Sequence, residues 1–427
     1  MDRLFIQGAS LAAVLVLLAG CGGSQPPIGA PGTMPQTSSL EAHTNSVNYK
    51  VLYSFGGGSD GAKPAGGLID VGGTLYGATS AGGSYSSCDY YESSGCGTVF
   101  TVTLTGTEKV LYSFANAPDG ASPNGSLIEV NGTLYGTTYF GGSSSCYGSI
   151  YANCGTVFSI TPSGTEKVIH SFAGASSDGA YPLAELIDVS GTLYGTTYEG
   201  GDFGTRHGYS ARGTVFSITT TGTEEVLHSF GFFHDGAYPE AGLIYVRGKL
   251  YGTTESGDGP RFGTVFSVTP DGKEKVLHSF GKGADGANPI ATLIELKGTL
   301  YGTTRAGGAY GLGTVFRITP GGTEKVLHSF GSGTDGAHPL GPLTDLKGRF
   351  YGTTRAGGAY SCSYGDCGTV FSITPDGKES VLYSFQGPQA SDGDWPASRL
   401  LKLDGTLYGT TVFGGTHNTG TVFSLKP

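Results

Sequence analysis

Seven Asp-Gly segments carry the most regularly spaced charged side chains of this sequence. They follow the pattern Asp-Gly-Ala-Xaa-Pro, with the variant Asp-Gly-Asp-Trp-Pro at residues 392–396. Carboxylates gathered on one face could attract cations, but calcium needs six or more converging oxygens, and one aspartate per segment is too widely spaced. An Asp before Gly is also typical of a turn in which the carboxylate caps backbone N–H groups. We favour this structural role and expect no bound metal and no cofactor.

The variable residue Xaa is a candidate for ligand contact, and so is the residue after each copy of a second recurring segment, Leu-Tyr-Gly-Thr-Thr. The Xaa residues are Lys63, Ser122, Tyr181, Tyr238, Asn288, His338 and Trp395, and the second set is Ser80, Tyr139, Tyr198, Glu255, Arg305, Arg355 and Val412. Aromatic rings beside Arg and Glu can stack on a sugar or a peptide and hydrogen-bond with it. Ordinary variation of exposed loops is the alternative. The candidate ligand-binding residues are Tyr181, Tyr238, Glu255, Arg305, His338, Arg355 and Trp395.

The sequence shows no catalytic constellation beside these residues. Four histidines occupy a position that holds tyrosine in other copies, which indicates packing; they are His170, His228, His278 and His328. The loop histidines His207, His234, His338 and His417 have no zinc-type spacing, and no Gly-Xaa-Ser-Xaa-Gly or phosphate-binding motif occurs. We therefore predict no catalytic residue.

These side chains must be positioned by a repeat. The tyrosine of Leu-Tyr-Gly-Thr-Thr recurs at Tyr76, Tyr135, Tyr194, Tyr251, Tyr301, Tyr351 and Tyr408. Each repeat contains four strand-like pieces, A to D, which in the third copy are residues 186–189, 192–197, 213–219 and 224–230. Xaa-Gly turns join A to B, and Pro- or Gly-containing turns join C to D. Four strands in such a meander are typical of one propeller blade.

The two ends of the repeat region predict how the ring closes. Residues 50–55 read as a D strand with no A, B or C before it, and residues 420–425 read as a C strand with no D after it. We predict an all-β, seven-bladed β-propeller with four strands per blade, closed by the N-terminal strand pairing in the last blade. The D strands begin with charges such as Glu108-Lys109, which we expect on exposed outer edges.

In a propeller the D-to-A and B-to-C loops emerge around one mouth of the channel. The B-to-C loops are long in the first three repeats and shorter in the fourth, fifth and seventh, so the later blades should leave the mouth open to a ligand. Trp395 is the only Trp of the chain and stands where the loop departs from its consensus. It is our candidate stacking platform, with packing against a neighbouring loop as the alternative.

The N-terminus predicts export and a lipid anchor. Residues 1–20 contain an apolar run too short to span a bilayer, which is typical of a signal peptide. The segment Leu18-Ala19-Gly20-Cys21 resembles a bacterial lipobox, so we predict lipidation at Cys21, with an ordinary signal peptide as the alternative. Residues 21–47 should be a flexible tether and residues 48–427 the propeller. The expected location is the bacterial cell envelope, lipid-anchored and extracytoplasmic, at the outer membrane or cell surface.

The remaining six cysteines and the net charge of the chain limit the range of possible partners. Paired cysteines in the loops of an exported chain predict the disulfides Cys88–Cys96, Cys146–Cys154 and Cys362–Cys367. Zinc is the alternative, but no pair has the usual two-residue spacing. A formal net charge of −10 excludes a nucleic-acid partner, because phosphates require clustered Lys and Arg. We expect a monomer.

The repeat resembles that of the so-called GloVer family of bacterial proteins. The resemblance rests on Leu-Tyr-Gly-Thr-Thr, Gly-Thr-Val-Phe, Ser-Phe and Asp-Gly-Ala-Xaa-Pro, and covers about residues 48–427. It implies a repeat domain with an interchangeable anchor, and it carries over no activity and no catalytic residue. Because the aromatic residues are dispersed over several repeats and no catalytic constellation accompanies them, we expect a non-enzymatic module that binds a polysaccharide, peptide or protein. A lyase or hydrolase acting on a polymer at the channel mouth and a surface scaffold are the alternatives, because the fold does not decide function.

Overall fold

The computed structural model describes residues 47–85, 88, 95–146, 153–174, 178–202, 212–231, 235–257, 262–281, 284–331, 333–362 and 365–427. The predicted signal peptide, Cys21, nearly all of the tether, His207 and His234 lie outside these residues. Residues Asn45–Pro427 form one compact unit. Within the described ranges, no helix has the length and apolar character needed to cross a membrane.

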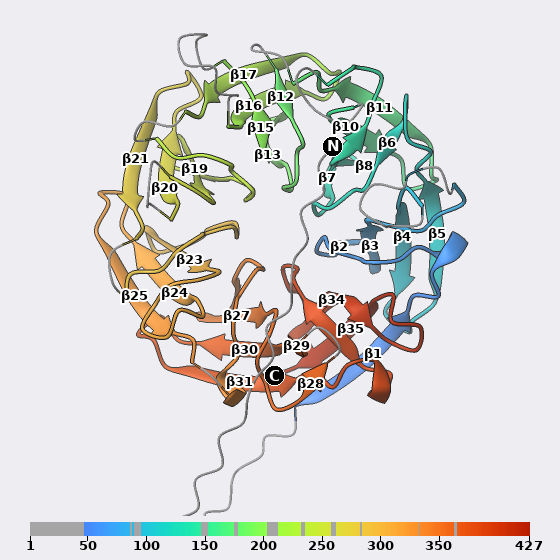
Figure 1. Ribbon diagram of the computed structural model, residues 1–427. Coiled ribbons are helices and arrows are strands. Elements are labelled where there is room, and N and C mark those ends of the chain that lie inside the picture. Colours follow the sequence, from blue (N-terminus) through green and yellow to red (C-terminus); the bar gives the residue numbers. More distant parts are fainter. Residues whose placement is uncertain are drawn as a thin grey trace, which may run out of the picture. The chain divides into compact units, whose positions relative to one another are not determined.

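Seven antiparallel sheets surround a central opening, as Figure 1 shows, and each has the meander order A-B-C-D. Blade 1 contains β2 (Ile69–Val71), β3 (Thr74–Thr79), β4 (Thr98–Thr103) and β5 (Glu108–Ser113). Blade 2 contains β7 (Ile128–Val130), β8 (Thr133–Thr138), β10 (Thr156–Ile160) and β11 (Glu166–Ser171). Blade 3 contains β13 (Ile187–Val189), β14 (Thr192–Thr197), β16 (Thr214–Thr219) and β17 (Glu224–Ser229). Blade 4 contains β18 (Ile244–Val246), β19 (Lys249–Thr254), β20 (Thr264–Val268) and β21 (Glu274–Ser279). Blade 5 contains β22 (Ile294–Leu296), β23 (Thr299–Thr304), β24 (Thr314–Ile318) and β25 (Glu324–Ser329). Blade 6 contains β26 (Thr344–Leu346), β27 (Arg349–Thr354), β30 (Thr369–Ile373) and β31 (Glu379–Ser384).

Blade 7 is completed by the N-terminal strand. It contains β33 (Leu401–Leu403), β34 (Thr406–Gly414) and β35 (Thr421–Lys426), and its outer strand is β1 (Asn48–Ser54). β1 pairs antiparallel with β35, with Tyr49 opposite Leu425 and Ser54 opposite Thr421. The predicted seven-bladed propeller and its closure by the N-terminal strand are confirmed.

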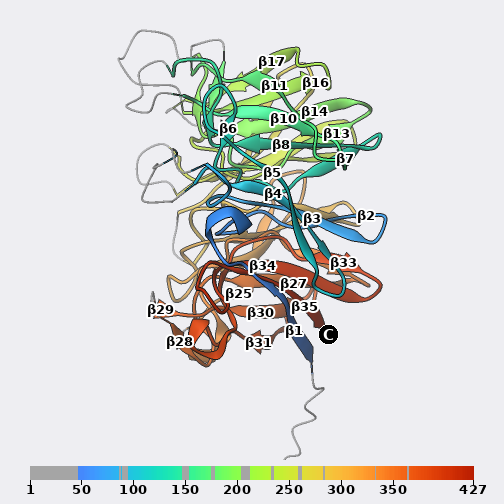
Figure 2. The same cartoon turned by 90° about the vertical axis from the view of Figure 1, so that its right-hand side faces the viewer.

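The loops of the two faces differ in structure. The A-to-B hairpins project on one face, and the D-to-A and B-to-C connections on the other, as Figure 2 shows for β6 and for β28 with β29. The connections of this second face contain the short strands β6 (Gly120–Ala121) with β9 (Phe140–Gly141), β12 (Gly179–Ala180) with β15 (Glu199–Gly200), β28 (Ser361–Cys362) with β29 (Gly365–Asp366), and β32 (Gly393–Pro396) beside β34. Three 3-10 turns, Gly58–Asp60, Gly333–Asp335 and Pro388–Ala390, lie in D-to-A connections.

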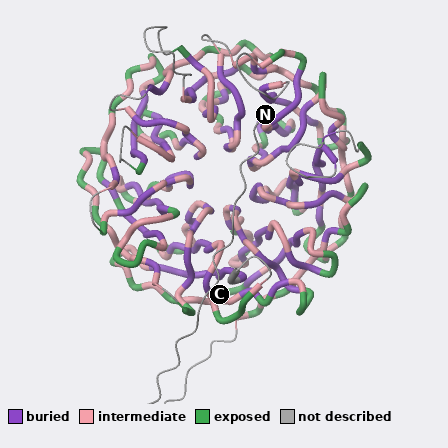
Figure 3. Tube along the Cα trace, in the orientation of Figure 1, coloured by how far each residue is buried: buried purple, intermediate pink, exposed green. Residues whose placement is uncertain are grey.

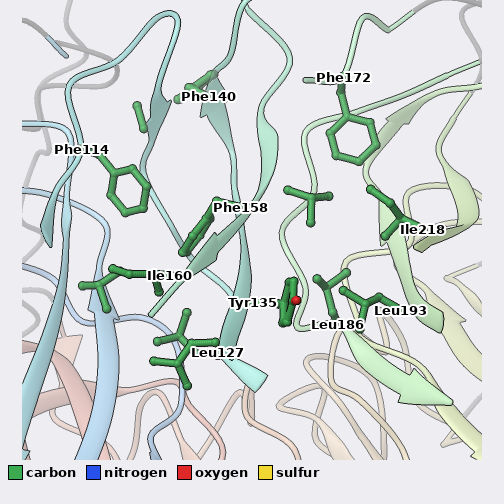
Figure 4. Close-up of a cluster of buried hydrophobic side chains, with 14 of the residues drawn as sticks. Phe114, Leu127, Tyr135, Phe140, Phe158, Ile160, Phe172, Leu186, Leu193 and Ile218 are labelled. Carbon is green, nitrogen blue, oxygen red and sulfur yellow. The ribbon is translucent and has the colours of Figure 1, made fainter. Parts of the chain in front are cut away.

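The core lies within and between the blades. Each Ser-Phe phenylalanine packs edge-to-face against the C-strand phenylalanine of the next blade, as in Phe114 with Phe158, whose ring centroids are 5.1 Å apart. The glycine of Leu-Tyr-Gly-Thr-Thr makes room for that C-strand ring, because a Cβ on Gly136 would lie 2.7 Å from the Phe158 ring. Figure 4 shows these buried rings with Tyr135, and Figure 3 shows exposed residues along the outer edges of the blades.

Three disulfides brace the loops of the mouth face. They join Cys88 to Cys96, Cys146 to Cys154, and Cys362 to Cys367, so the predicted pairing is confirmed and the zinc alternative is wrong. Disulfides are typical of proteins outside the reducing cytoplasm. The protein is therefore extracytoplasmic in character.

Candidate binding site at the channel mouth

The Xaa residue of each Asp-Gly-Ala-Xaa-Pro segment is held in the left-handed backbone region. All seven have φ between 54° and 59°, although none is glycine. The His338 N–H donates to the Leu312 carbonyl of the preceding blade at 2.8 Å, and the His338 carbonyl accepts from the Arg355 N–H at 3.1 Å. A non-glycine residue with this φ carries a steric cost of about 1 kcal/mol or more. The sequence thus keeps a side chain at seven positions where glycine would be less strained.

The residue after each B strand is positioned by a buried threonine. Thr304 is fully buried, and its hydroxyl donates to the Ala306 carbonyl at 2.8 Å. The same hydroxyl lies 2.9 Å from the Thr314 hydroxyl and accepts the Thr314 N–H at 3.1 Å. Arg305 lies between Thr304 and Ala306, so its backbone is fixed on both sides. The same threonine network recurs at the other B-strand ends, for example at Thr138.

The two variable positions meet at the junctions between blades. The Xaa side chain of one blade contacts the residue after the B strand of the blade before it. Tyr238 stacks on Tyr198 with ring centroids 4.8 Å apart, and the Asn288 amide donates to the Glu255 carbonyl at 3.1 Å. His338 Nδ1 lies 2.9 Å from the Arg305 carbonyl, and the Arg355 guanidinium lies 3.9 Å from the centre of the Trp395 ring. The mouth is therefore lined by pairs that neighbouring blades build together.

Consecutive pairs of blades 4 to 6 enclose a cavity of about 340 Å³. Its lining residues are Glu255, Asn288, Arg305, Ala306, His338 and Arg355. Four of these are candidate residues from the sequence analysis. Asn288 belongs to the variable set but was not selected, because a single amide has no distinctive chemistry in a sequence. A second cavity of about 440 Å³ lies near His170 and three serines, and none of its described lining residues is Arg, Lys, Asp or Glu.

The cavity concentrates positive charge in an acidic protein. Arg305 Nη1 lies 4.0 Å from Glu255 Oε1, at the limit of an ion pair. Burial and the neighbouring Arg305 hold the pKa of Arg355 below its usual range, partly offset by Asp394. Within the described part of the chain, no carboxylate lies within ion-pair distance of Arg355. The Arg305 carbonyl can only accept a hydrogen bond, so we assign a proton to His338 Nδ1, which faces it. The second ring nitrogen, Nε2, is not used by this contact.

Two acids near this cavity were missed by sequence reasoning. Burial, together with Glu255, raises the pKa of Glu240 to about 7, while Arg305 lowers it. Burial raises the pKa of Asp394 to about 6, and one of its oxygens is buried with no hydrogen-bond partner among the described residues. Asp394 replaces the alanine of the repeat, which is the signal that could have found it, whereas Glu240 stands at a position that varies among the repeats. Burial also raises the pKa of Glu255.

The remaining candidates lie beside the cavity or away from it. The ring of Tyr181 is only 3% exposed and packs against Tyr139, with centroids 5.1 Å apart. Its selection as a ligand contact is therefore corrected, because neighbouring rings cover it. Tyr238 is half-buried, stacked on Tyr198 and 5.1 Å from the Arg212 guanidinium. Trp395 is half-buried, with its indole N–H buried and without a partner among the described residues. Arg355 covers one face of its ring, so Trp395 supports an arginine instead of presenting a bare platform.

The Asp of each Asp-Gly segment has a structural role at the outer rim. Asp178 accepts the Ala173 N–H at 2.8 Å and lies 3.2 Å from His170 Nε2. Tyrosine makes the same contact elsewhere, as in Tyr112 to Asp119 at 2.9 Å. The Glu that begins the next D strand faces this pair. One oxygen of that Glu is buried with no hydrogen-bond partner among the described residues in six blades; these are Glu108, Glu166, Glu224, Glu274, Glu324 and Glu379.

These rim glutamates correct the expectation that they lie on exposed edges. They are half-buried, whereas the following residue is exposed in every case. At the seventh junction Tyr49 takes the Glu position, and its hydroxyl donates to Asp392. Ligand-type atoms of His170, Asp178 and Glu224 lie within 4.8 Å of one another, as do those of two equivalent groups at His278 and His328. Because tyrosine replaces the histidine at other junctions, the shared role is hydrogen bonding.

An ion pair spans the central channel. Arg399 precedes β33 of blade 7, and its guanidinium donates to Glu185, which precedes β13 of blade 3. These blades are not neighbours in the ring. The residues at equivalent positions include Gly67 and Gly242, which are small. The pair therefore connects opposite walls of the channel.

The profile of the Gloeobacter/Verrucomicrobia repeat matches residues 39–209 and 204–423. The protein belongs to this family. The resemblance noted in the sequence is thereby confirmed, and the family places the chain among bacterial proteins. In this chain, the segments that recur form the blades, and the residues that vary line the mouth. A comparison with curated proteins finds no match.

Solved structures with partial structural similarity to this chain include several enzymes. A gluconolactonase, XC5397 from Xanthomonas campestris, has 14% identity and a TM-score of 0.35, covering 64% of this chain and 78% of that one. A quinohemoprotein alcohol dehydrogenase from Comamonas testosteroni has 11% identity and a TM-score of 0.48, covering 88% and 76%. A puromycin-hydrolyzing peptidase from Mycobacterium tuberculosis has 10% identity and a TM-score of 0.46, covering 81% of this chain and 48% of that one. Likeness at this level concerns the fold and assigns no activity.

Proposed function

We propose that this Gloeobacter/Verrucomicrobia repeat protein is a non-enzymatic, extracytoplasmic binding module. It binds a segment of a polysaccharide, peptide or protein at the mouth formed by blades 4 to 6. The observation that carries the proposal is the cavity of about 340 Å³, lined by unlike polar side chains that break the repeat. Pockets of this size with a few convergent polar groups are typical of binding sites.

Binding should be tested with glycan and peptide arrays probed with the full-length protein in mild detergent. A ligand found on an array should bind the Asn288→Ala and His338→Ala variants more weakly, because both side chains line the cavity. His417→Ala is a matched control, since His417 lies outside the cavity lining. A protein that binds nothing on either array would support the scaffold alternative instead.

A hydrolase or lyase is the second candidate, and one observation favours it. Glu240 has a pKa raised to about 7 by burial and by the nearby Glu255. A carboxyl group with a raised pKa, close to a second carboxyl group, can act as the general acid in the cleavage of glycosidic bonds. Incubating the protein with an array-positive polymer and measuring new reducing ends distinguishes the two functions. Cleavage abolished by Glu240→Gln would establish the enzyme, whereas binding without cleavage supports the module.

We further propose that Cys21 carries the lipid anchor. The proposal rests on the segment Leu18-Ala19-Gly20-Cys21 and on the disulfides, which accord with export. Cys21→Ser should release the protein from the membrane fraction of the producing bacterium. Retention of the variant in that fraction would reject lipidation at this residue.

A further inference from the structure

We infer that the mouth cavity recognises the carboxylate of an acidic sugar, so that the ligand is a polysaccharide containing uronic acid. The inference rests on the proposed binding function and names the ligand class. It starts from the two arginines of the cavity, Arg305 and Arg355. The chain has a net charge of −10, so two arginines in one cavity are a local reversal of charge.

Arg355 is arranged to receive a planar anion. The guanidinium carbon lies over the Trp395 ring, 3.9 Å from the ring centre, a distance typical of stacking, and among the described residues the Arg355 side chain has no ion-pair or hydrogen-bond partner. Stacking restricts the guanidinium to one plane and leaves the N–H groups on its edge available. An edge with two parallel donors matches a carboxylate. Arg305 also repels Arg355, which a bound anion would relieve.

Arg305 is only loosely neutralised by the protein. Its distance of 4.0 Å from Glu255 is long for a charged hydrogen bond, and its side chain is 44% exposed. The charged side chains that line the cavity, two arginines and Glu255, sum to about +1, and the neighbouring acids Glu240 and Asp394 reduce this charge. The cavity therefore suits a monoanion better than a group with more negative charge. A phosphate group, with a charge of about −1.5 to −2, would be repelled by Glu255 more strongly than a carboxylate.

The other lining groups match sugar hydroxyls. Glu255 accepts hydrogen bonds, the Asn288 amide both donates and accepts, and His338 retains Nε2. A uronic acid presents one carboxylate and several hydroxyls on a single ring, which uses both kinds of partner. The stacked rings of Tyr198 and Tyr238 lie at the adjacent junction, where further sugar rings of a polymer would pass.

The test compares polymers that differ only in charge. Polygalacturonate is measured against its methyl ester, which keeps the backbone and removes the carboxylate charge. Alginate and hyaluronan extend the panel to other acidic sugars, and polyglutamate represents acidic peptides. Binding of each to full-length protein in mild detergent is measured by calorimetry at physiological ionic strength, so that long-range attraction is screened.

Two arginine variants and one control complete the experiment. Arg355→Gln and Arg305→Gln each remove a cavity charge, and Arg317→Gln removes an exposed charge from β24 outside the cavity. At least one acidic polysaccharide should bind, and each cavity variant should weaken it about tenfold, the scale of one lost charged hydrogen bond. Arg317→Gln should stay within about twofold. For polygalacturonate, esterification should weaken binding at least as much as the cavity variants do.

Three results would overturn the inference. Equal binding of polygalacturonate and its ester would mean a neutral sugar site, in which case the proposed binding function still stands. Binding of polyglutamate with no binding of any acidic polysaccharide would assign a peptide ligand. Equal binding by Arg317→Gln, Arg305→Gln and Arg355→Gln would place recognition elsewhere on the protein.

Discussion

The Arg355 guanidinium lies 3.9 Å from the centre of the Trp395 ring, and the two residues come from different blades. Arg355 follows β27 of blade 6, whereas Trp395 lies in the loop that leads into blade 7. The neighbouring contact of His338 with the Arg305 carbonyl joins blades 5 and 6 in the same way. The chemistry of the mouth is therefore assembled at blade junctions, and no single repeat contains a complete site.

Trp395 should report on this contact by fluorescence, because the chain contains one Trp. Arg355→Ala uncovers one face of the indole, so we expect a red-shifted emission and stronger quenching by acrylamide. Arg317→Ala should leave both unchanged, since Arg317 is exposed on a C strand of blade 5. An unchanged spectrum in Arg355→Ala would mean that the stacked arrangement is not populated in solution.

Ligand binding should strengthen as the pH falls through about 7. Burial and the nearby Glu255 raise the pKa of Glu240 to about 7, and Arg305 opposes this shift. Protonation of Glu240 removes a negative charge beside the cavity, while a uronate remains ionised. We expect about threefold tighter binding of polygalacturonate at about pH 6 than at about pH 8, the scale of a partly screened charge. Glu240→Gln should reduce this difference to the smaller contribution of Asp394, whose pKa burial raises to about 6 beside Arg355. A Glu240→Gln variant that kept the full difference would show that Glu240 is not responsible.

The rim glutamates predict how stability depends on pH. Burial, together with the nearby Asp178 and Glu225, raises the pKa of Glu224 to about 7, although His170 opposes this shift. In the unfolded chain this pKa returns to about 4.5. Between these two pH values, the Glu224 carboxyl group binds its proton more tightly in the folded state than in the unfolded state. The contribution of Glu224 to the unfolding free energy is therefore largest below about pH 4.5 and falls as the pH rises to about 7.

Glu224→Gln should therefore raise the melting temperature at about pH 8 and change it little at about pH 5.5. The exposed neighbour Glu225 provides the matched control, and Glu225→Gln should have a small effect at both pH values. Differential scanning calorimetry measures both. If Glu224→Gln lowers the melting temperature at the higher pH, the buried oxygen is held by a partner that the Gln side chain cannot replace.

Histidine and tyrosine should be interchangeable at the rim. His228 Nε2 lies 3.2 Å from Asp235, and Tyr112 reaches Asp119 at 2.9 Å from the equivalent position. His228→Tyr should change the unfolding free energy by about 0.5 kcal/mol or less, whereas His228→Phe removes the donor and should cost about 1 kcal/mol or more. Urea unfolding distinguishes these values. A chelator should not shift the midpoint, and a shift would indicate a metal at the His-Asp-Glu groups.

Removing the closing strand should cost most of the stability. Deletion of residues 48–56 exposes the edge of β35 and removes Tyr49, which stacks on Tyr383 with centroids 3.8 Å apart. A milder variant, Tyr49→Phe, keeps the strand and loses only the hydrogen bond to Asp392. Thermal unfolding should rank parent, Tyr49→Phe and deletion in decreasing order. A deletion that melts like the parent would contradict closure by β1.

The fold could be predicted because its determinants are local and repeat seven times. The turn residues Asn131 and Asp404 have φ of 52° and 49°, as the Xaa-Gly turns required. The partners of the rim glutamates could not be predicted, because Glu224 meets Asp178 and His170 across a blade junction. One signal was available: this Glu is present in six repeats, whereas the next residue changes from Lys109 to Glu225 and Ser380.

The candidate site was predictable in its location and less so in its details. Glu255, Arg305, His338 and Arg355 meet in one cavity because two variable positions per repeat converge on one face. The burial of Tyr181 and the covering of Trp395 by Arg355 depend on which residue the preceding blade places opposite. Such pairing between residues about forty positions apart leaves no local pattern in the sequence.

The contact of Arg399 with Glu185 across the channel has a consequence for any polymer that binds at the mouth. A chain cannot be threaded end-first through a channel whose opposite walls are joined, so it must lie across the opening by an internal stretch. Chain ends are then irrelevant to capture, and one long molecule can be gripped by many copies of the protein at once. Attachment at many sites gives a high overall avidity, although the affinity of each individual site stays the same.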